Sequence, residues 1–167
     1  MVNTGIISSR EIWDILETVT DPEVPVLTIT DLGIVRDVKI NGPAIEVIIT
    51  PTYTGCPAID MIAMNIKWAL VEKGFSPVKV RSVLSPAWTT DWMTEAGKKK
   101  LKAYGIAPPN PKQQVCRDEL FAPDEAVQCP RCDSFHTHRI SEFGSTACKS
   151  LYQCDDCREP FDYFKCH

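Results

Sequence analysis

Four cysteines in the last third of the chain have the spacing of a metal site. They form two pairs, "CPRC" (Cys129 and Cys132) and "CDDC" (Cys154 and Cys157), with 21 residues between the pairs. Two cysteines separated by two residues can hold one metal ion from a single tight turn, and a second such turn completes a tetrahedron of thiolates. We therefore predict a Zn(II) ion at a closed structural site, with an iron–sulfur cluster as the alternative. Because four thiolates leave no open coordination position, this site is not expected to activate water.

Other potential ligands in this half of the chain lack a comparable spacing. They are Cys148, Cys166, His136, His138 and His167. Cys148 and Cys166 could form a second pair, although the sequence does not bring them together. We predict instead that both are buried or spare thiols and that the histidines are polar surface groups. The aromatic side chains of "EPFDYFKCH" are predicted to pack locally on the metal-binding hairpin.

A further cysteine, Cys56, lies far from these ligands, in "TPTYTGCPAIDMI". It directly precedes Pro57, which suits the first position of a helix because its missing N–H costs nothing there. The free backbone N–H groups and the positive dipole end of that helix favour a thiolate over a thiol. A functional, ionised thiol is therefore one interpretation of Cys56. The other is a small buried apolar side chain, which is the commonest state of a free cysteine.

Local patterns predict the elements that position these residues. "SSRE" is typical of a helix start, with Ser8 as cap and Glu11 reaching back to it, and Asp21-Pro22 ends that pattern. Two β-rich runs flank Asn41-Gly42, the dipeptide best suited to a hairpin turn, and Ile45, Val47 and Ile49 would share one strand face.

The rest of the first domain alternates helix and strand. A helix is predicted over residues 57–73, with a buried stripe at helical spacing, and Gly74 stops it. "PVKVRSVL" then predicts a strand, a fourth short strand is possible over residues 85–89, and a helix with Asp91 as cap covers residues 92–103. The stripe of the 57–73 helix consists of Ile59, Ile62, Ile66 and Leu70.

The fold class predicted from this order is α+β. Residues 1–105 read α-β-β-α-β-α, a small two-layer α/β sandwich. Residues 106–125 are predicted to be a proline-rich linker, and residues 126–167 a four-cysteine zinc ribbon. A segment of this length rarely folds unaided, so the metal is expected to hold the ribbon together.

Composition and charge exclude several classes of protein. The first ten residues lack an apolar signal core, and no stretch is apolar enough to span a membrane, so we expect a cytoplasmic protein with reduced thiols. Residues 1–115 carry 12 basic and 12 acidic side chains, whereas residues 116–167 carry 6 and 10, a net charge of −4. This acidic second half argues against binding to nucleic acid.

Three stretches resemble a known family of iron–sulfur assembly domains. They are "DPEVPVLTITDLGIVRDV" (residues 21–38), "TYTGCPA" (residues 52–58) and "SPAWTTDWMTEA" (residues 85–96). In this order and at these separations they are similar to the domain typified by SufT, over roughly residues 8–105. The resemblance implies an α+β fold and a part in maturing iron–sulfur proteins. It also implies that Asp21 and Glu23 lie near Cys56, as oxygen ligands or a proton acceptor, although "DPE" is also a plain helix end.

The stretches within the predicted zinc ribbon point to a more specific family. "CPRC", "SEFGSTACKSLYQCDDC" and "REPFDYFKCH" are similar to the PaaD (PaaJ) family of phenylacetate degradation, and the likeness extends over essentially the whole chain. It implies an accessory factor that helps to mature the iron–sulfur or di-iron centres of a phenylacetyl-CoA epoxidase. The implied partners are the oxygenase and reductase subunits and the iron–sulfur assembly machinery. A transient iron ion or cluster at Cys56 is the implied cargo.

The residues themselves leave two other functions open. One is an enzyme with Cys56 as covalent nucleophile, which the absence of histidine from residues 1–105 disfavours. The other is a zinc ribbon that binds nucleic acid, which the charge disfavours. The chain has no glycine-rich phosphate loop and no Glu-x-x-His pair for a di-iron site, so we do not expect it to be catalytic alone.

Overall fold

The computed structural model describes residues 8–110 and 126–165. Its contacts divide the chain into two compact units. The first comprises residues 1–88 and 92–94, and the second comprises residues 89–91 and 95–167. Both combine a small sheet with irregular segments, and helices occur in each, so the predicted α+β class is confirmed.

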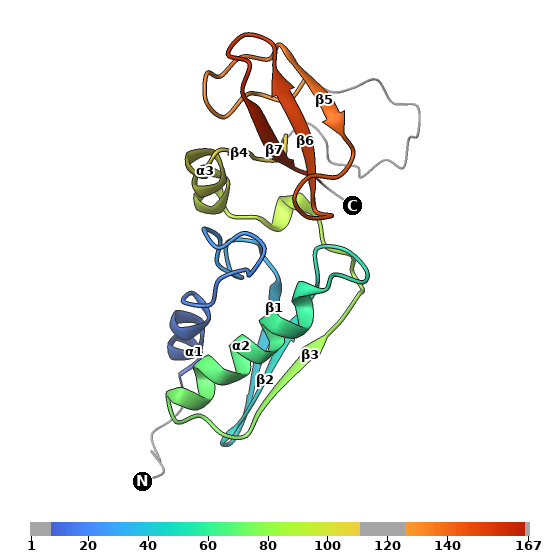
Figure 1. The fold of residues 1–167 in the computed structure, drawn as a ribbon. Coiled ribbons are helices and arrows are strands. Elements are labelled where there is room, and N and C mark those ends of the chain that lie inside the picture. The colour runs from blue at the N-terminus through green and yellow to red at the C-terminus, as the bar shows by residue number, and fades with distance from the viewer. Residues whose placement is uncertain (1–7, 111–125, 166–167) are drawn as a thin grey trace. The chain divides into compact units, whose positions relative to one another are not determined.

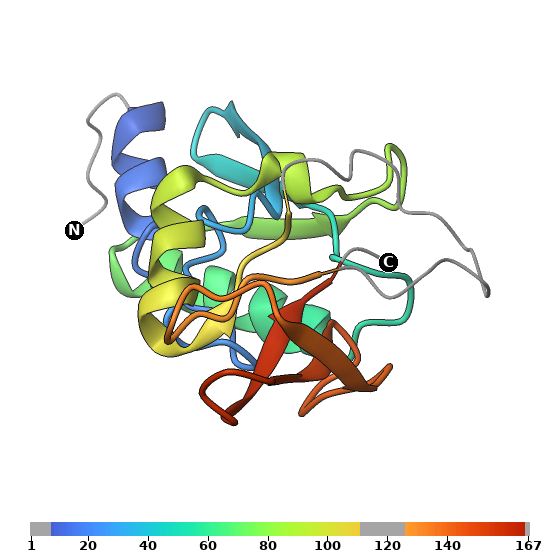
Figure 2. The same ribbon diagram turned by 90° about the horizontal axis from the view of Figure 1, so that it is seen from above.

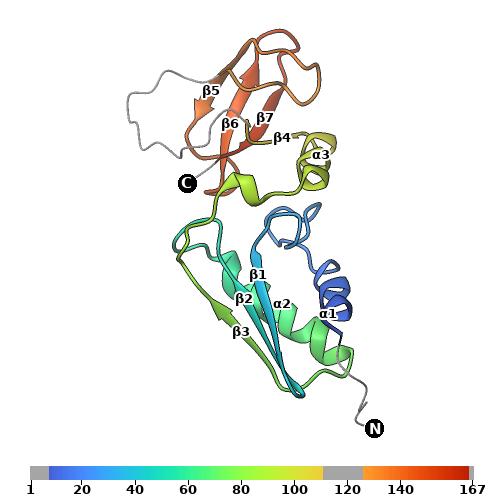
Figure 3. The ribbon, with the colours of Figure 1, turned by 180° about the vertical axis from the view of Figure 1, so that it is seen from behind.

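The first unit is a layer of helix on a three-stranded sheet (Figure 1). Its elements are α1 (Ser9–Leu16), β1 (Val35–Asn41), β2 (Ala44–Ile49), α2 (Ala58–Glu72) and β3 (Val78–Ser82). The strand order is β1-β2-β3, with β1 antiparallel and β3 parallel to β2. Seen from behind, the strands stand in front of α2, so α2 covers one face of the sheet (Figure 3). The parallel pair is possible because α2 forms the crossover between its strands.

Burial in this unit follows the alternation of the strands. Ile45, Val47 and Ile49 are buried together, as predicted from their period of two. On the opposite face, Glu46 Oε1 pairs with Arg81 Nε at 3.5 Å and with Lys79 Nζ at 3.9 Å. From α2 the sheet is covered by Ile62, Ile66 and Leu70, as predicted. The fourth buried residue is Ala58 and not the predicted Ile59, which is only half-buried.

Two predicted turns differ in detail from the structure. Ser8 is the N-cap of α1, but its side chain makes no capping hydrogen bond, so the predicted capping box is not formed. Asn41 pairs with Ala44, so the hairpin turn consists of Gly42 and Pro43 and not of Asn41 and Gly42. A positive φ of 61° at Gly42, followed by proline, fits a type II′ turn, because proline cannot adopt the second positive φ of type I′.

The segment before the last helix departs most from its prediction. Residues 85–89 form no strand, so the fourth strand that the sequence left possible there is absent. A short 3₁₀ helix, η1 (Thr90–Trp92), follows, and α3 (Glu95–Tyr104) begins three residues later than the predicted start at Trp92. Thr94 is bonded to Asp31 in the loop before β1. Its N–H donates to the Asp31 carbonyl at 2.9 Å, and its hydroxyl donates to Asp31 Oδ1 at 3.0 Å. These tertiary bonds override the helical pattern.

The second unit is a four-stranded sheet of order β4-β7-β6-β5. After α3 come β4 (Ile106–Ala107), β5 (Thr137–Ser141), β6 (Lys149–Cys154) and β7 (Pro160–Phe164). Strands β6 and β7 lie side by side as an antiparallel hairpin (Figure 2). β4 belongs to the stretch predicted as linker, but it pairs in parallel with β7 and is buried. Most of that stretch, residues 111–125, lies outside the described residues.

Candidate metal centre and the Cys56 site

The four predicted metal ligands converge on one point of the second unit. The sulfurs of Cys129, Cys132, Cys154 and Cys157 all lie within 4.8 Å of one another. Sγ of Cys129 is 3.8 Å from that of Cys157, and Sγ of Cys132 is 3.5 Å from that of Cys154. A tetrahedron with metal–sulfur bonds of about 2.3 Å has sulfur–sulfur edges of about 3.8 Å, so the spacing fits a single ion of the size of Zn²⁺. Thiolates around a cluster of several iron atoms would stand farther apart.

Each Cys-x-x-Cys turn is built in the same way. Cys129 N–H donates to the Ser134 carbonyl at 2.8 Å, and Cys154 N–H donates to the Glu159 carbonyl at 3.1 Å, five residues on in both cases. The residue after each second cysteine, Asp133 or Arg158, has a positive φ, 61° and 64° respectively. Two turns of one conformation thus face each other across the four sulfurs.

Two glutamines complete this repeat. Gln128 and Gln153 each precede the first cysteine of a pair, in "QCPRC" and "QCDDC". The side-chain amide of Gln128 donates to the Asp133 carbonyl at 3.2 Å, and that of Gln153 donates to the Arg158 carbonyl, also at 3.2 Å. The shared Gln-Cys-x-x-Cys pattern is the sequence signal that could have identified these two glutamines.

Backbone N–H groups prepare one of the sulfurs for a cation. The Cys157 N–H lies 3.5 Å from Sγ of Cys154 and is the main reason why the pKa of Cys154 falls to about 7. A thiol with this pKa is about half ionised at neutral pH, and the ionised form is the one that binds metal. Cys129 and Cys154 are fully buried, while Cys132 is exposed at the rim.

The ribbon core is packed directly on the buried sulfurs. Tyr152, Phe161 and Tyr163 belong to one cluster with Cys129 and Cys154. The Tyr152 ring stacks on Phe161 with centroids 6.0 Å apart and meets Tyr163 edge-on at 5.6 Å. The predicted local packing of these aromatic side chains is therefore confirmed. Loss of the metal would open the site on which this small core rests.

The remaining candidate ligands that the structure describes, His136, His138 and Cys148, stay apart from the four clustered cysteines. His136 and His138 are exposed, with Nδ1 atoms 3.3 Å and 3.0 Å from Asp156 and Asp155 respectively. Cys148 is buried, and its sulfur lies 3.0 Å from the Thr146 hydroxyl. Cys166, predicted to be a buried or spare thiol, and His167, predicted to be a polar surface group, lie outside the described residues.

Cys56 lies at the start of α2, as predicted, and it is buried there. The N-cap is Pro57, one residue later than predicted, and Cys56 is only 8% exposed. Burial raises the pKa of Cys56 above its ordinary value of 9.0, and this exceeds the lowering by the N–H of Ala58. Of the two interpretations of Cys56, the burial favours a protonated thiol over a resting thiolate, because the helix end does not compensate for lost solvation.

The two carboxylates implied by the family resemblance do act on Cys56. Negative charge on Glu23, and less on Asp21, raises the pKa of the thiol further, whereas a hydrogen bond with the Tyr53 side chain lowers it. Asp21 is buried and Asp21 Oδ1 accepts the N–H groups of Glu23 and Val24 at 2.7 Å and 2.9 Å. Asp21 therefore shapes the turn that carries Glu23, in addition to its charge near Cys56.

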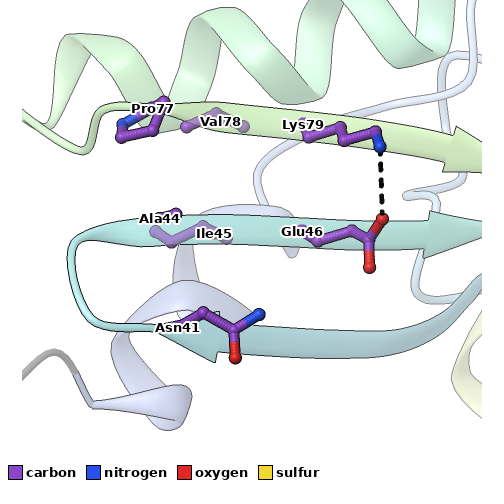
Figure 4. A pocket seen from close by; sticks show the side chains of 7 residues that line it. All are labelled: Asn41, Ala44, Ile45, Glu46, Pro77, Val78 and Lys79. Carbon is purple, nitrogen blue, oxygen red and sulfur yellow. Dashed lines mark ion pairs between the residues drawn. The ribbon is translucent and has the colours of Figure 1, made fainter.

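Among the residues described, the four ribbon cysteines are the one group of three or more His, Cys, Asp or Glu side chains close enough to bind an ion. Cys56, Asp21 and Glu23 do not form such a group as they stand. The first unit also holds a pocket of about 370 Å³ that contains none of these three residues. Figure 4 shows it at one end of β2 and β3, next to the ion pair of Glu46 and Lys79. Its lining consists of Asn41, Ala44, Ile45, Glu46, Pro77, Val78 and Lys79.

The described helices include none with the length and apolar character needed to cross a bilayer.

Comparison with known proteins assigns a family to both parts of the chain. Residues 9–81 match the family model described as "Iron-sulfur cluster assembly protein", and residues 113–165 match "PaaD zinc beta ribbon domain". A solved structure of a "Domain of Unknown Function DUF59" from Bacillus anthracis is 28% identical, with a TM-score of 0.52. The aligned region covers 55% of this chain and 89% of the Bacillus anthracis chain.

Two curated relatives extend this assignment. An Escherichia coli (strain K12) protein, whose name gives it as one subunit of a "Putative 1,2-phenylacetyl-CoA epoxidase", is 56% identical over 157 residues, 94% of this chain and 92% of the relative. A Porphyromonas gingivalis (strain ATCC BAA-308 / W83) protein named "Fe-S protein maturation auxiliary factor" is 33% identical over 97 residues, 57% of this chain and 91% of the relative. The chain therefore belongs to the PaaD family and joins an iron–sulfur cluster assembly domain to a PaaD zinc β-ribbon domain.

Proposed function

We propose that this protein is an accessory factor of a phenylacetyl-CoA epoxidase, acting in aerobic phenylacetate degradation in the cytoplasm. It would help to mature the iron–sulfur or di-iron centres of partner subunits, namely the oxygenase and the reductase, together with the iron–sulfur assembly machinery. The observation that carries this proposal is the thiol of Cys56 beside Glu23 and Asp21, inside the domain that matches iron–sulfur assembly proteins. The name of the Escherichia coli relative supports the choice of client.

The charges around Cys56 suit a cation that arrives and leaves. Burial and the two carboxylates both disfavour a further negative charge on Cys56, so the thiol stays protonated while no cation is present. An incoming iron ion reverses this, since a cation attracts both carboxylates and drives the coordinating thiol to release its proton. Cys56 would then bind iron or a cluster briefly, and the exposed neighbours Thr54 and Gly55 leave the turn open to solvent.

We also propose that the metal of the ribbon is Zn(II), in a structural role. Cys129, Cys132, Cys154 and Cys157 would supply all four ligands, so no position remains for water or substrate. Zinc in such a site contributes folding free energy and no redox chemistry. The chemistry of cargo handling would therefore belong to Cys56 and not to the ribbon.

A deletion strain tests the proposed function. Loss of the gene is expected to lower the iron content and activity of the purified epoxidase, and with them growth on phenylacetate. Wild-type protein restores all three, whereas Cys56→Ser is expected to keep the fold and the ribbon metal but fail to restore them. Cys148→Ser is the matched control, because Cys148 is equally buried but lies in the ribbon. Full restoration by Cys56→Ser would show that the thiol is only structural.

The enzyme alternative is disfavoured by the same charges. A nucleophilic cysteine needs a lowered pKa or an adjacent base, and the pKa of Cys56 is raised. We expect that the purified protein does not oxidise phenylacetyl-CoA with or without NADPH, and that no acyl group accumulates on Cys56. Detection of a covalent Cys56 adduct by mass spectrometry would favour the enzyme instead.

A further inference from the structure

Helix α2 carries apolar side chains on two opposite faces. The inner face packs on the sheet through Ala58, Ile62, Ile66 and Leu70. The outer face carries a second apolar set, here called the outer stripe, whose members are 45–66% exposed. The outer stripe consists of Met61, Met64, Trp68 and Val71. Most surface helices present polar residues on the face that points away from the core, and a helix that is apolar all round is usually buried.

The spacing of the outer stripe is that of a contact surface. Its residues follow one another at intervals of three, four and three, so at about 100° per residue they keep within a band about 80° wide. Trp68, the most exposed of them at 66%, stands near the middle of the band. Methionine and tryptophan are enriched in the cores of protein interfaces, and tryptophan is a frequent hot spot.

We propose that the outer stripe docks into an apolar groove on a client subunit of the epoxidase. This inference rests on the proposed function and names the surface through which the client is engaged. A helix face is convex, so a concave partner covers it best, which is the mode in which a helix lies in a groove with anchors at i, i+3 and i+7. The flexible methionine side chains of the outer stripe can adapt to the shape of such a groove.

A second copy of this chain fits the outer stripe less well. The exposed apolar area of four such side chains is on the order of 400 Å², within the range of the largest patch on an ordinary monomer. Two copies joined only through this patch would bury about 800 Å² in total, below the roughly 1,200 Å² at which stable interfaces begin. Two convex helix faces would bury even less. A transient contact with a grooved partner agrees better with this area.

The outer stripe begins close to Cys56 along the chain. At about 1.5 Å of rise per residue, Met61 lies about 8 Å and Val71 about 22 Å beyond Cys56 along the helix direction. A client that lies along the outer stripe therefore has one end near the turn that carries Cys56. Docking and hand-over would then use one continuous element, and a client site could be presented to the thiol while the stripe holds the client.

The test uses the full chain and the epoxidase oxygenase and reductase subunits of the same organism, expressed without accessory proteins. Their affinity for the immobilised chain is measured by biolayer interferometry. We expect at least one subunit to bind the wild-type chain. Trp68→Glu should raise the Kd of that complex more than tenfold, whereas Trp68→Phe should raise it much less. Leu84→Glu is the matched control, since Leu84 is 57% exposed in the same unit but lies outside the outer stripe. Melting temperatures of all variants are compared with that of the wild type.

Three outcomes would overturn the docking inference. These are no binding of either subunit, equal affinity of Trp68→Glu and wild type, and a wild-type dimer in sedimentation that Trp68→Glu converts to monomer. Cys56→Ser separates this inference from the proposed function, because it should bind the client with wild-type affinity while failing to restore epoxidase iron. Restoration of iron by Cys56→Ser would sink the proposed function and leave the measured docking in place.

Discussion

Gly33 faces the backbone of Trp92 so closely that a Cβ at position 33 would overlap the Trp92 carbonyl oxygen. Two further bonds fix the same approach: Trp88 Nε1 donates to the Leu32 carbonyl at 2.8 Å, and Thr94 is bound to Asp31. The Arg36 guanidinium also lies 3.5 Å from the centre of the Trp92 ring. Trp88 and residues 92–94 are therefore anchored on the loop before β1, and the first unit closes through this contact.

Replacement of Gly33 by alanine should destabilise the first unit strongly. The φ of +66° already strains an L-residue, and overlap with the Trp92 backbone adds to that strain. We expect the free energy of unfolding to fall by about 2–4 kcal/mol in urea titrations followed by tryptophan emission. Gly42→Ala is the matched control, because its φ is +61° and no atom lies within 4 Å of the new Cβ. A similar loss in both variants would show that overlap with Trp92 contributes nothing.

Two threonines should respond in opposite directions to the same substitution, the buried Thr50 and the exposed but hydrogen-bonded Thr94. The Thr50 hydroxyl is buried and, within the described part of the chain, has no hydrogen-bond partner, whereas the Thr94 hydroxyl donates to the Asp31 carboxylate. Thr50→Val removes an unpaired polar group and keeps nearly the same side-chain shape, so the free energy of unfolding should rise by about 1 kcal/mol. Thr94→Val should lower the free energy of unfolding by about 1–3 kcal/mol. Equal destabilisation in both would contradict the assignment of Thr50 as unpaired.

Features that depend on neighbours in sequence were predictable. Alternation identified the buried face of β2, and helical spacing identified the buried face of α2. The Cys-x-x-Cys spacing identified all four sulfurs of the metal centre, because each turn needs only its own residues to present two ligands. The hairpin was found but shifted by one residue, since Gly42-Pro43 also satisfies a two-residue turn.

Features that depend on distant residues were not predictable in the same way. The start of α3 is delayed because Thr94 bonds to a residue 63 positions earlier, which no local pattern reveals. β4 forms because β7, more than 50 residues later, supplies its partner strand. The sequence left two states of Cys56 open for the same reason: its burial and the charge of Glu23 come from tertiary packing, whereas the helix end beside it is local.

Removal of the ribbon metal should unfold the second unit alone. We expect one zinc per chain by elemental analysis of protein purified without air. A chelator that extracts it should abolish the protected amides of β5–β7 in hydrogen-exchange measurements, because the core rests on Cys129 and Cys154. Amides of α2 and β2 belong to the other unit and should keep their protection. Cys129→Ser should reproduce the chelated state. Iron and sulfide in place of zinc would contradict this assignment of the site.

The paired glutamines should contribute equally to metal binding. Each amide holds the carbonyl of a left-handed residue that follows a cysteine ligand, so its loss loosens one of the two turns. We expect Gln128→Ala and Gln153→Ala each to weaken zinc affinity by about 10-fold, at the lower end of the range for groups that orient ligands. Competition with a chromophoric chelator measures the affinity. Gln128→Glu is informative as well, since a carboxylate cannot donate to the Asp133 carbonyl and should not restore binding.

Cys56 should react slowly with alkylating reagents, with a pH dependence set by its raised pKa. Only the thiolate reacts, so at pH 8 its rate with iodoacetamide should fall below that of a cysteine of pKa 9.0 in a free peptide, and should still be rising above pH 9. The rate is measured by mass spectrometry of the peptide that contains Cys56 in the metal-loaded protein. Because burial is the largest cause, denaturation should restore the rate of the free peptide.

Removing the charge of Glu23 offers a second test of the raised pKa of Cys56. Glu23→Gln should lower the pKa of Cys56 and speed its alkylation at pH 8, whereas Glu17→Gln removes an equal charge from an exposed site and should not. The effect on stability has a definite sign. Since the thiol of the folded state keeps its proton above 9.0, the free energy of unfolding should decline as the pH rises beyond that value, and less steeply in Glu23→Gln. Identical alkylation profiles in wild type and Glu23→Gln would show that Glu23 does not act on Cys56, and the proposed cation site would lose its main electrostatic support.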